Sequence, residues 1–334
     1  MPESAASTYV KSLPLAERLH RRAPDLASQI YSDPVRTFLR DGVVILPGAI
    51  DLDSLDQLDD DLIRLASNKD DLLLGSVEID GPEKYYKSRF LRNLSINDFR
   101  QEPPGLKLVD LQRFFDSARG IAFAPVVTTF LEELFGAPPA LIQSLTFWKS
   151  SEQPIHQDFS YVHHHRRLGE LAAAWIPLED IHPDSGPLVY YKGSHLPDQL
   201  GFYDWGQGSI LASRDADHSV YDNYTRHLER IIEERGLQPS IFLPKRGDLL
   251  LWHGALIHGG TPMRNPEITR RSFVCHYTTV ASHKRAQAFR VADGFSFDTP
   301  PVPIHRLSLR SRLKARLQRR LTPPLQRALA QWRS

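Results

Sequence analysis

The spacing of hydrophobic residues divides the chain into a helical first part and a β-rich second part, with the change near residue 141. Leucines at helical spacing over 52–65, with acidic residues between them, predict an amphipathic helix. A second helix is predicted over 122–135, with Gly136 as its stop signal. Residues 38–48 predict a helix end, a glycine turn and a short buried strand. Residues 1–33 are polar and interrupted by proline, and we expect an N-terminal arm that is extended apart from a short helical piece.

Beyond residue 141, short apolar runs are separated by Gly, Pro and Asp, which is typical of strands joined by turns. They predict a sandwich, barrel or jelly roll rather than a βαβ fold. The stretch 196–240 is polar and aromatic, with a helix predicted over 224–235. An insertion of this size in a β-scaffold favours a lid or a binding wall. The predicted strands are 141–148, 171–177, 187–191, 248–252 and 272–279.

Composition places the chain among globular proteins and excludes several classes. Of 334 residues, 41% are hydrophobic and 24% charged, enough for a sizeable core. The formal net charge of +1 gives the molecule as a whole no attraction to nucleic acid. A single cysteine, Cys275, excludes a disulfide framework and a cysteine-rich zinc site. With no secretory signal pattern and no run of about 18 apolar residues, we expect a cytoplasmic protein without a membrane span.

The end of the chain differs from the rest in charge. Between Arg306 and Ser334 there are nine Lys or Arg and no Asp or Glu, and leucine recurs every fourth position from 309 to 321. This pattern predicts a basic amphipathic helix. Three interpretations stay open: a helix packed on the domain, a disordered end, or a helix in peripheral contact with an anionic membrane surface. A nucleic-acid site is disfavoured because no binding module can be recognised.

These patterns predict three parts along the chain. An N-terminal arm (1–33) precedes one domain (34–300), whose β-rich core is expected at about 141–281. The basic tail (301–334) follows.

One motif points to metal chemistry. On an extended segment, His156 and Asp158 point to the same face and can hold one ion together. The third ligand must come from elsewhere, and His258 is favoured over His253, which ends a predicted strand. Two imidazoles and one carboxylate leave metal positions open, as in non-haem Fe(II) oxygenases. A His-x-Asp triplet also arises by chance among 14 histidines, and the second one, at 182–184, is interpreted as a surface turn.

Two arginines follow the third candidate ligand. Arg270 stands twelve residues after His258, with Arg271 beside it. A guanidinium near a metal can hold a dicarboxylate through two parallel hydrogen bonds, which lysine does less well. The arginine therefore strengthens the metal interpretation and suggests a dicarboxylate co-substrate.

From about residue 37 to 280 the chain resembles the phytanoyl-CoA dioxygenase family of Fe(II)- and 2-oxoglutarate-dependent oxygenases. Each matching piece is weak alone, but five in family order are specific. The pieces are Phe38–Gly48; Gln143–Phe147 ahead of His156-Gln157-Asp158; Ala174-Trp175; Gly186–His195; and Gly247–Gly259 with Arg270 behind it.

The resemblance implies a fold and a set of site residues. The fold is mainly β with flanking helices (α+β), around a double-stranded β-helix, or cupin-like jelly roll. His156, Asp158 and His258 match the family's iron ligands. Arg270 matches the residue that pairs with the distal carboxylate of 2-oxoglutarate, and it is favoured over Arg271 because the family's strand begins with the arginine at this position.

Other positions match the family less closely. Trp175 matches a position that packs against 2-oxoglutarate, and Gln143 is a weaker match to the same co-substrate. The family often has a small hydroxyl residue two positions after the distal histidine. Here that residue is Gly260, so the hydrogen bond is either missing or moved to Thr261. Asp158 disfavours the halogenating branch, in which a small residue replaces the carboxylate.

The resemblance implies a dioxygenase that uses Fe(II), 2-oxoglutarate and O2, with ascorbate as an optional auxiliary cofactor. It would release succinate and CO2 and hydroxylate an unactivated C–H bond of a small-molecule, lipid-type or glycan-type substrate. Two alternatives stay open: an inactive jelly roll that only binds a ligand, and a cupin-type metal enzyme that does not use 2-oxoglutarate. The sequence selects neither a substrate nor an oligomeric state.

Four further features have two interpretations each. The run 163–167, three histidines and two arginines, is a solvated loop or a contact for an anionic substrate. Tyr161 and Tyr190 line the pocket or fill the core. His195 is expected in a turn rather than at a metal, and Cys275 is expected as a buried strand residue rather than a nucleophile.

Overall fold

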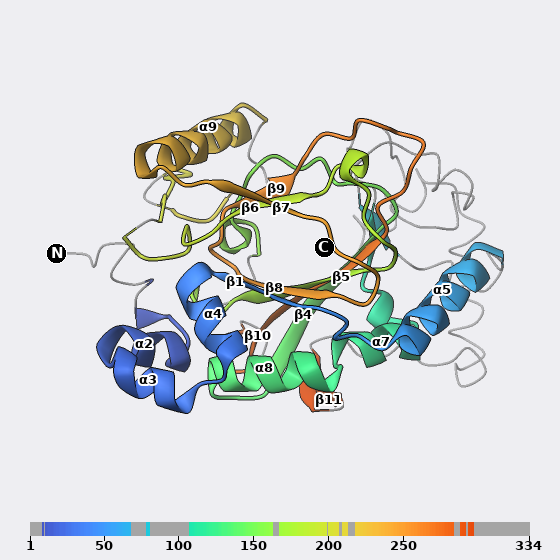
Figure 1. Ribbon diagram of the computed structural model, residues 1–334, viewed down its shortest axis with the longest axis horizontal. Helices are drawn as coiled ribbons and strands as arrows, with labels where there is room; N and C mark the ends of the chain where they lie inside the picture. Colours follow the sequence, from blue (N-terminus) through green and yellow to red (C-terminus); the bar gives the residue numbers. More distant parts are fainter. Residues whose placement is uncertain are drawn as a thin grey trace, which may run out of the picture.

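Two β-sheets face each other, and helices cover the outer face of the larger sheet (Figure 1). The computed structural model describes residues 9, 11–67, 78–80, 107–162, 167–198, 200–206, 209–212, 218–283, 288–291 and 293–296. The predicted tail (301–334) and residues 163–166 of the histidine-rich run lie outside the described residues. No helix among the residues described combines the length and the apolar content that a membrane span requires.

The two sheets form the predicted jelly roll. Its strand pairs are antiparallel apart from β12 with β4. In order, the larger sheet contains β1 (Val43–Leu46), β8 (Leu249–His253), β5 (Ala172–Pro177), β10 (Ser272–Thr279), β4 (Pro139–Phe147), β12 (Gly294–Ser296) and β11 (Phe289–Val291), with β3 (Lys107–Val109) beside β4 and β2 (Glu78–Asp80) beside β3. The smaller sheet contains β7 (Pro239–Phe242), β6 (Leu188–Tyr191) and β9 (His258–Gly260).

The helices lie mostly on one side of this scaffold, and α9 lies beside the smaller sheet (Figure 1). They are α2 (Leu15–Arg22), α3 (Pro24–Ile30), α4 (Asp33–Asp41), α5 (Leu52–Ser67), α7 (Asp116–Ala122), α8 (Pro125–Phe135) and α9 (His218–Arg235). Short 3-10 turns are η3 (Leu111–Arg113), η4 (Asp158–Ser160) and η5 (Pro183–Ser185).

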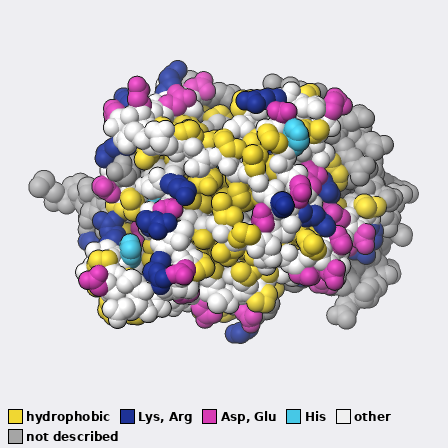
Figure 2. All heavy atoms as spheres, viewed as in Figure 1, with side chains coloured by type: hydrophobic (Ala, Val, Ile, Leu, Met, Phe, Trp, Pro, Cys, Tyr) yellow, Lys and Arg dark blue, Asp and Glu magenta, His cyan; other side chains and the backbone are white. Residues whose placement is uncertain are grey.

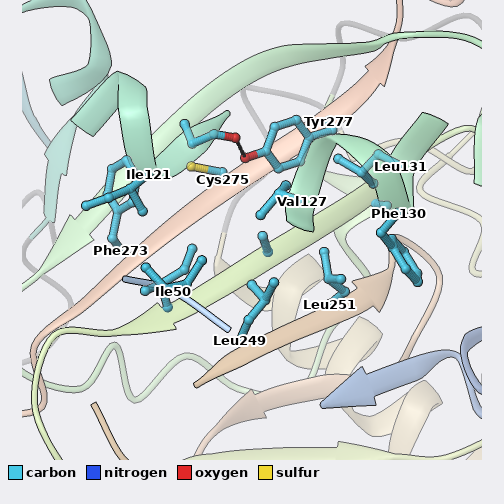
Figure 3. Close-up of a cluster of buried hydrophobic side chains, with 14 of the residues drawn as sticks. Ile50, Ile121, Val127, Phe130, Leu131, Leu249, Leu251, Phe273, Cys275 and Tyr277 are labelled. Atoms are coloured by element: carbon cyan, nitrogen blue, oxygen red, sulfur yellow. Dashed lines mark hydrogen bonds between the residues drawn. The ribbon is translucent and has the colours of Figure 1, made fainter. Parts of the chain in front are cut away.

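The central strands β5, β8 and β10 of the larger sheet are buried along their whole length, which explains the nearly continuous apolar sequence of β5 and β8. Along β10, Phe273, Cys275 and Tyr277 face the helices and pack with residues of α7 and α8 (Figure 3). The Tyr277 hydroxyl donates a hydrogen bond of 2.6 Å to the carbonyl of Ala122. Because side chains alternate along a strand, Val274 faces the opposite side, into the space between the sheets. That space holds the site.

The predicted helices and strands of the domain are largely confirmed, with shifted ends. The helix predicted over 122–135 is observed as α8 and begins three residues later, because α7 ends at Ala122 and Pro125 starts α8 as a first-turn residue. Gly136 ends α8 in the left-handed conformation, with φ of 69°. The strand predicted at 272–279 is observed over the same residues.

The N-terminal segment differs from its prediction. Residues 15–30 form α2 and α3, where we expected an extended arm with only a short helical piece. Ala16, Ala27 and Tyr31 are buried in the same core cluster as the larger sheet. Polar composition concealed this because the fully buried side chains of the two short helices are few, namely Ala16 and Glu17 in α2 and Ala27 in α3.

Candidate metal and co-substrate site

The predicted metal ligands come together between the two sheets. His156 and Asp158 follow β4, and His258 begins β9. The backbones of the two histidines pair with each other, since His156 N–H donates to His258 O (2.8 Å) and His258 N–H donates to His156 O (3.0 Å). Asp158 Oδ1 lies 3.5 Å from His156 Nε2 and 3.6 Å from His258 Nε2. One ligand atom from each of the three residues lies within 4.8 Å of the others, so the group can hold one ion.

In both imidazoles, Nδ1 contacts the backbone and Nε2 is left to face the metal position. His156 Nδ1 contacts Pro154 O, and His258 Nδ1 contacts Leu256 O, each at 2.9 Å. A carbonyl can only accept, so each Nδ1 carries a proton and Nε2 is the nitrogen left to bind a metal. Burial lowers the pKa of His258 to about 4, so this imidazole is neutral at physiological pH. This arrangement is typical of histidine metal ligands.

The two oxygens of Asp158 have different surroundings. Oδ1 faces the imidazoles, whereas Oδ2 accepts a hydrogen bond of 2.7 Å from the indole N–H of Trp252 and lies 3.3 Å from His276 Nε2. Burial by itself raises the pKa of Asp158, but the neighbouring His258, His276 and His156 hold it well below its usual range. The carboxylate is therefore ionised, as a metal ligand must be.

A buried cation stands in the same cavity as the triad. Arg270 is 3% exposed, and its Nε and Nη1 atoms have no hydrogen-bond partner among the described residues. Its guanidinium lies 5.5 Å from the ring of Trp175. Burial lowers the pKa of Arg270 to about 10, which leaves it charged at neutral pH. An unpaired buried charge is costly, so these donors fit an anion that enters the cavity.

Arg271 points elsewhere. It forms ion pairs with Asp59 (2.7 Å) and Glu179 (2.9 Å) and lies over the ring of Trp148. Arg270 is therefore the arginine of the pair that faces the cavity.

His253 also lies away from the triad. Its Nε2 is 3.3 Å from the carboxylate of Glu17, and its Nδ1 accepts the backbone N–H of Ala255. His195 lies in the predicted turn and away from the triad, and it is buried beside His253, with ring centroids 5.3 Å apart.

The cavity has a volume of about 80 Å³, several times what one water molecule needs. Trp175 lines it, whereas Gln143 is not among the lining residues and has its side-chain nitrogen 3.3 Å from Nδ1 of His276, which is among them. The lining residues are Leu145, Phe147, Ser151, Gln153, His156, Asp158, Trp175, Leu188, Trp252, His258, Gly259, Gly260, Arg270, Val274 and His276.

The hydroxyl expected near position 260 has another source. Thr261 donates its hydroxyl to Pro187 O and does not line the cavity. The hydroxyl oxygen of Ser151 lies 3.0 Å from the point where a Cβ on Gly260 would stand. Ser151 therefore places a hydroxyl beside Gly260 in the lining of the cavity.

Two residues of the site, Trp252 and His276, were missed in the sequence. Strand alternation could have indicated both, because Trp252 shares a strand face with Leu250, and His276 is an even number of residues from Arg270. Of the tyrosines with open roles, Tyr161 contacts the edge of the His156 ring at 5.6 Å, and Tyr190 is buried with Trp175 in the core between the sheets.

Comparison with known proteins identifies relatives of this fold. A sequence model of the phytanoyl-CoA dioxygenase family matches residues 38–272. A curated mouse (Mus musculus) protein, phytanoyl-CoA dioxygenase domain-containing protein 1, is 22% identical over 170 residues, which cover 49% of this chain and 53% of that protein. The chain thus matches about half the length of this relative.

Solved structures resemble the fold at low sequence identity. The carbocyclase SnoK of nogalamycin biosynthesis, described as non-haem and α-ketoglutarate-dependent, is 15% identical, with a TM-score of 0.51 over 75% of this chain and 85% of that one. The epimerase SnoN, in complex with Fe3+, α-ketoglutarate and a nogalamycin, is 18% identical with a TM-score of 0.51, over 84% and 97%. EctD from S. alaskensis, with 2-oxoglutarate and 5-hydroxyectoine, is 17% identical with a TM-score of 0.51, over 82% and 86%.

Proposed function

This chain belongs to the phytanoyl-CoA dioxygenase family, and from that premise we propose that it is an Fe(II)- and 2-oxoglutarate-dependent dioxygenase. The reaction would hydroxylate an unactivated C–H bond of a small-molecule, lipid-type or glycan-type substrate and release succinate and CO2. One observation carries the proposal: a buried His-Asp-His group lines the same cavity as a buried arginine whose Nε and Nη1 atoms have no hydrogen-bond partner among the described residues.

The proposed roles follow from the donor set. His156, Asp158 and His258 hold Fe(II), because two imidazoles and one carboxylate suit this metal and leave positions open. Arg270 pairs with the distal carboxylate of 2-oxoglutarate, and Trp175 packs beside it. When bound, iron and 2-oxoglutarate supply the activation of O2 that oxidises the substrate.

The chain's own residues contribute binding, orientation and exclusion of water. The histidine Nδ1 atoms are fixed by backbone carbonyls, which orients both Nε2 atoms before a metal arrives. The desolvated Arg270 gains a strong charge-assisted hydrogen bond only when a carboxylate enters, which favours a dicarboxylate over a neutral molecule. Asp158 supplies a carboxylate ligand, which disfavours halogenation.

Two alternatives compete with this proposal. An inactive binding protein would need no ionised carboxylate beside two imidazoles whose Nδ1 atoms are held by backbone carbonyls. A cupin-type enzyme that does not use 2-oxoglutarate would need no buried arginine in the cavity. The ligand set and Arg270 together therefore favour the dioxygenase over both.

Succinate release is the direct test. Purified protein with Fe(II), O2 and 2-oxoglutarate should produce succinate slowly even without the primary substrate, and Asp158→Ala should abolish it. Asp184→Ala, in the exposed second His-x-Asp triplet, is the matched control and should retain the wild-type rate. Metal binding without succinate production would favour the cupin alternative. Absence of both metal binding and succinate production would favour the binding protein.

We also propose that the basic tail brings the enzyme to anionic membrane surfaces in the cytoplasm. On the face shown in Figure 2, acidic and basic side chains are intermixed, whereas residues 306–334 carry nine basic and no acidic residues. Each basic residue near an anionic leaflet contributes about 1 kcal/mol, screened by salt. Full-length protein should sediment with phosphatidylserine vesicles, and high salt should abolish this binding. A chain ending at Pro303 should not sediment with the vesicles but should retain 2-oxoglutarate turnover. Absence of vesicle binding by the full-length chain would refute the idea.

A further inference from the structure

His276 lies on β10, and among the described residues it is the one whose imidazole contacts Asp158 Oδ2. Its Nε2 is 3.3 Å from Oδ2, and the Trp252 indole N–H donates to the same oxygen at 2.7 Å. All three side chains are buried. The oxygen that does not face His156 and His258 is thus occupied by protein groups from two strands.

The proton on His276 is placed by a neighbour. The side-chain amide nitrogen of Gln143, which can only donate, lies 3.3 Å from His276 Nδ1. Nδ1 therefore accepts, and the ring proton is on Nε2, which faces Asp158. The three residues form a chain of contacts from β4 through β10 to the metal motif.

A β-bulge in β4 makes this chain possible. Gln143 is opposite His276 and Leu141 is opposite Tyr277, so Ile142 is an extra residue between the two pairs. The first pair is on the cavity side and the second faces the helices. Without the extra residue, one of the pairs would point to the wrong face.

We propose that His276, with its proton placed by Gln143, is a positioning residue that holds Asp158 so that Oδ1 alone faces the metal position. This inference rests on the proposed function and deepens it. Two donors on Oδ2 fix the carboxylate plane and keep this oxygen away from the ion. A single coordinating oxygen leaves more open positions for the co-substrate and O2 than a carboxylate bound through both oxygens.

Two other roles for His276 fit less well. As a fourth metal ligand it would need a free Nε2 lone pair, but the Gln143 contact puts the proton there. As a contact for 2-oxoglutarate it would use the same N–H that faces Asp158. His276 lines the cavity, so the experiment must separate these roles from positioning.

The test is Co(II) binding to the full-length protein without 2-oxoglutarate, followed by visible absorption, which reports coordination number. His276→Leu removes the donor at similar size, and His276→Gln keeps an N–H near the Nε2 position. We expect His276→Leu to bind Co(II) at least about tenfold more weakly with an altered spectrum, in line with loss of an outer-sphere partner, and His276→Gln to restore most of the affinity. Cys275→Ala, on the same strand but facing the helices, controls for general destabilisation and should bind normally.

Each result decides the point. Wild-type affinity and spectrum in His276→Leu would overturn the inference, and so would a His276→Gln variant as weak as the leucine variant. A raised KM for 2-oxoglutarate with unchanged Co(II) binding would assign His276 to the co-substrate instead. If His276→Leu fails to fold, Gln143→Leu takes its place and should weaken Co(II) binding in the same direction, with unchanged binding again overturning the inference. Failure of the wild-type protein to bind Co(II) would refute the proposed function itself.

Discussion

The carboxylate of Glu17 lies 3.3 Å from His253 Nε2, and the two side chains are 2% and 1% exposed. This contact joins α2 to the end of β8 across 236 positions of sequence. Burial by itself raises the pKa of Glu17, but His253, His195 and Arg21 lower it below its usual value, so the carboxylate is ionised. The N-terminal helices are therefore attached to the domain by a buried polar contact as well as by apolar packing.

We expect Glu17→Ala to destabilise the protein by about 3 kcal/mol, because it leaves a buried imidazole N–H without its partner. Arg18→Ala, exposed on the same helix, is the control and should change the stability by less than about 0.5 kcal/mol. Denaturant unfolding measures both. In the double variant Glu17→Ala/His253→Ala, the losses should be non-additive by about 1 kcal/mol or more, and strict additivity would show that the two side chains do not interact.

The buried His195 predicts a loss of stability in mild acid. Burial lowers its pKa from 6.5 to about 4, with a further lowering by His253. The unfolded chain therefore binds a proton at this residue between these pH values while the folded protein does not, so stability falls as the pH drops from about 6.5 to 4. By pH 4.5 the loss from this residue should reach about 2–3 kcal/mol.

The measurement is the unfolding free energy at pH 7 and 4.5. The decrease in unfolding free energy from pH 7 to 4.5 should be smaller in His195→Gln by about 2–3 kcal/mol, because the glutamine amide does not titrate. His182→Gln, at a histidine whose side chain is 61% exposed, should follow the wild-type profile. Identical pH profiles for wild type and His195→Gln would rule out this source of acid sensitivity.

Gly42 illustrates what local sequence could predict and what it could not. The sequence predicted a glycine turn between helix and strand, and Gly42 ends α4 with φ of 75°, a conformation that glycine adopts at little cost. Its second constraint comes from far along the chain, because a Cβ there would collide with the ring of His195. Only the folded structure shows that second reason.

The same division holds for the site. Spacing and the family resemblance predicted the triad and Arg270, because each lies in a short, recognisable segment, and the structure brings all four to one cavity. Local spacing and the family resemblance could not predict contacts between strands that are distant in sequence. The link of Gln143 to Asp158 through His276 depends on the register of β4 and β10 and on a bulge that no local pattern marks.

The two candidate distal histidines should separate in metal binding. His258→Ala should lose Co(II) binding and 2-oxoglutarate turnover, because its Nε2 lies 3.6 Å from Asp158 Oδ1. His253→Ala should still bind one metal ion, although it unfolds at lower denaturant concentration, because its partner is Glu17. Titration of both purified variants decides this. An intact site in His258→Ala beside an empty one in His253→Ala would reverse the assignment of the ligand.

Arg270 and Arg271 provide a matched pair for the co-substrate. Arg270→Lys keeps a positive charge but loses the planar pair of donors, so the KM for 2-oxoglutarate should rise by roughly ten- to a hundredfold, equivalent to about 1.5–3 kcal/mol. Co(II) affinity measured without 2-oxoglutarate should stay near the wild-type value, because Arg270 is proposed to bind the co-substrate and not the metal. Arg271→Lys should instead leave the KM unchanged and lower the stability modestly, since Arg271 binds Asp59 and Glu179. A raised KM in Arg271→Lys with a normal one in Arg270→Lys would mean that the wrong arginine has been placed beside 2-oxoglutarate.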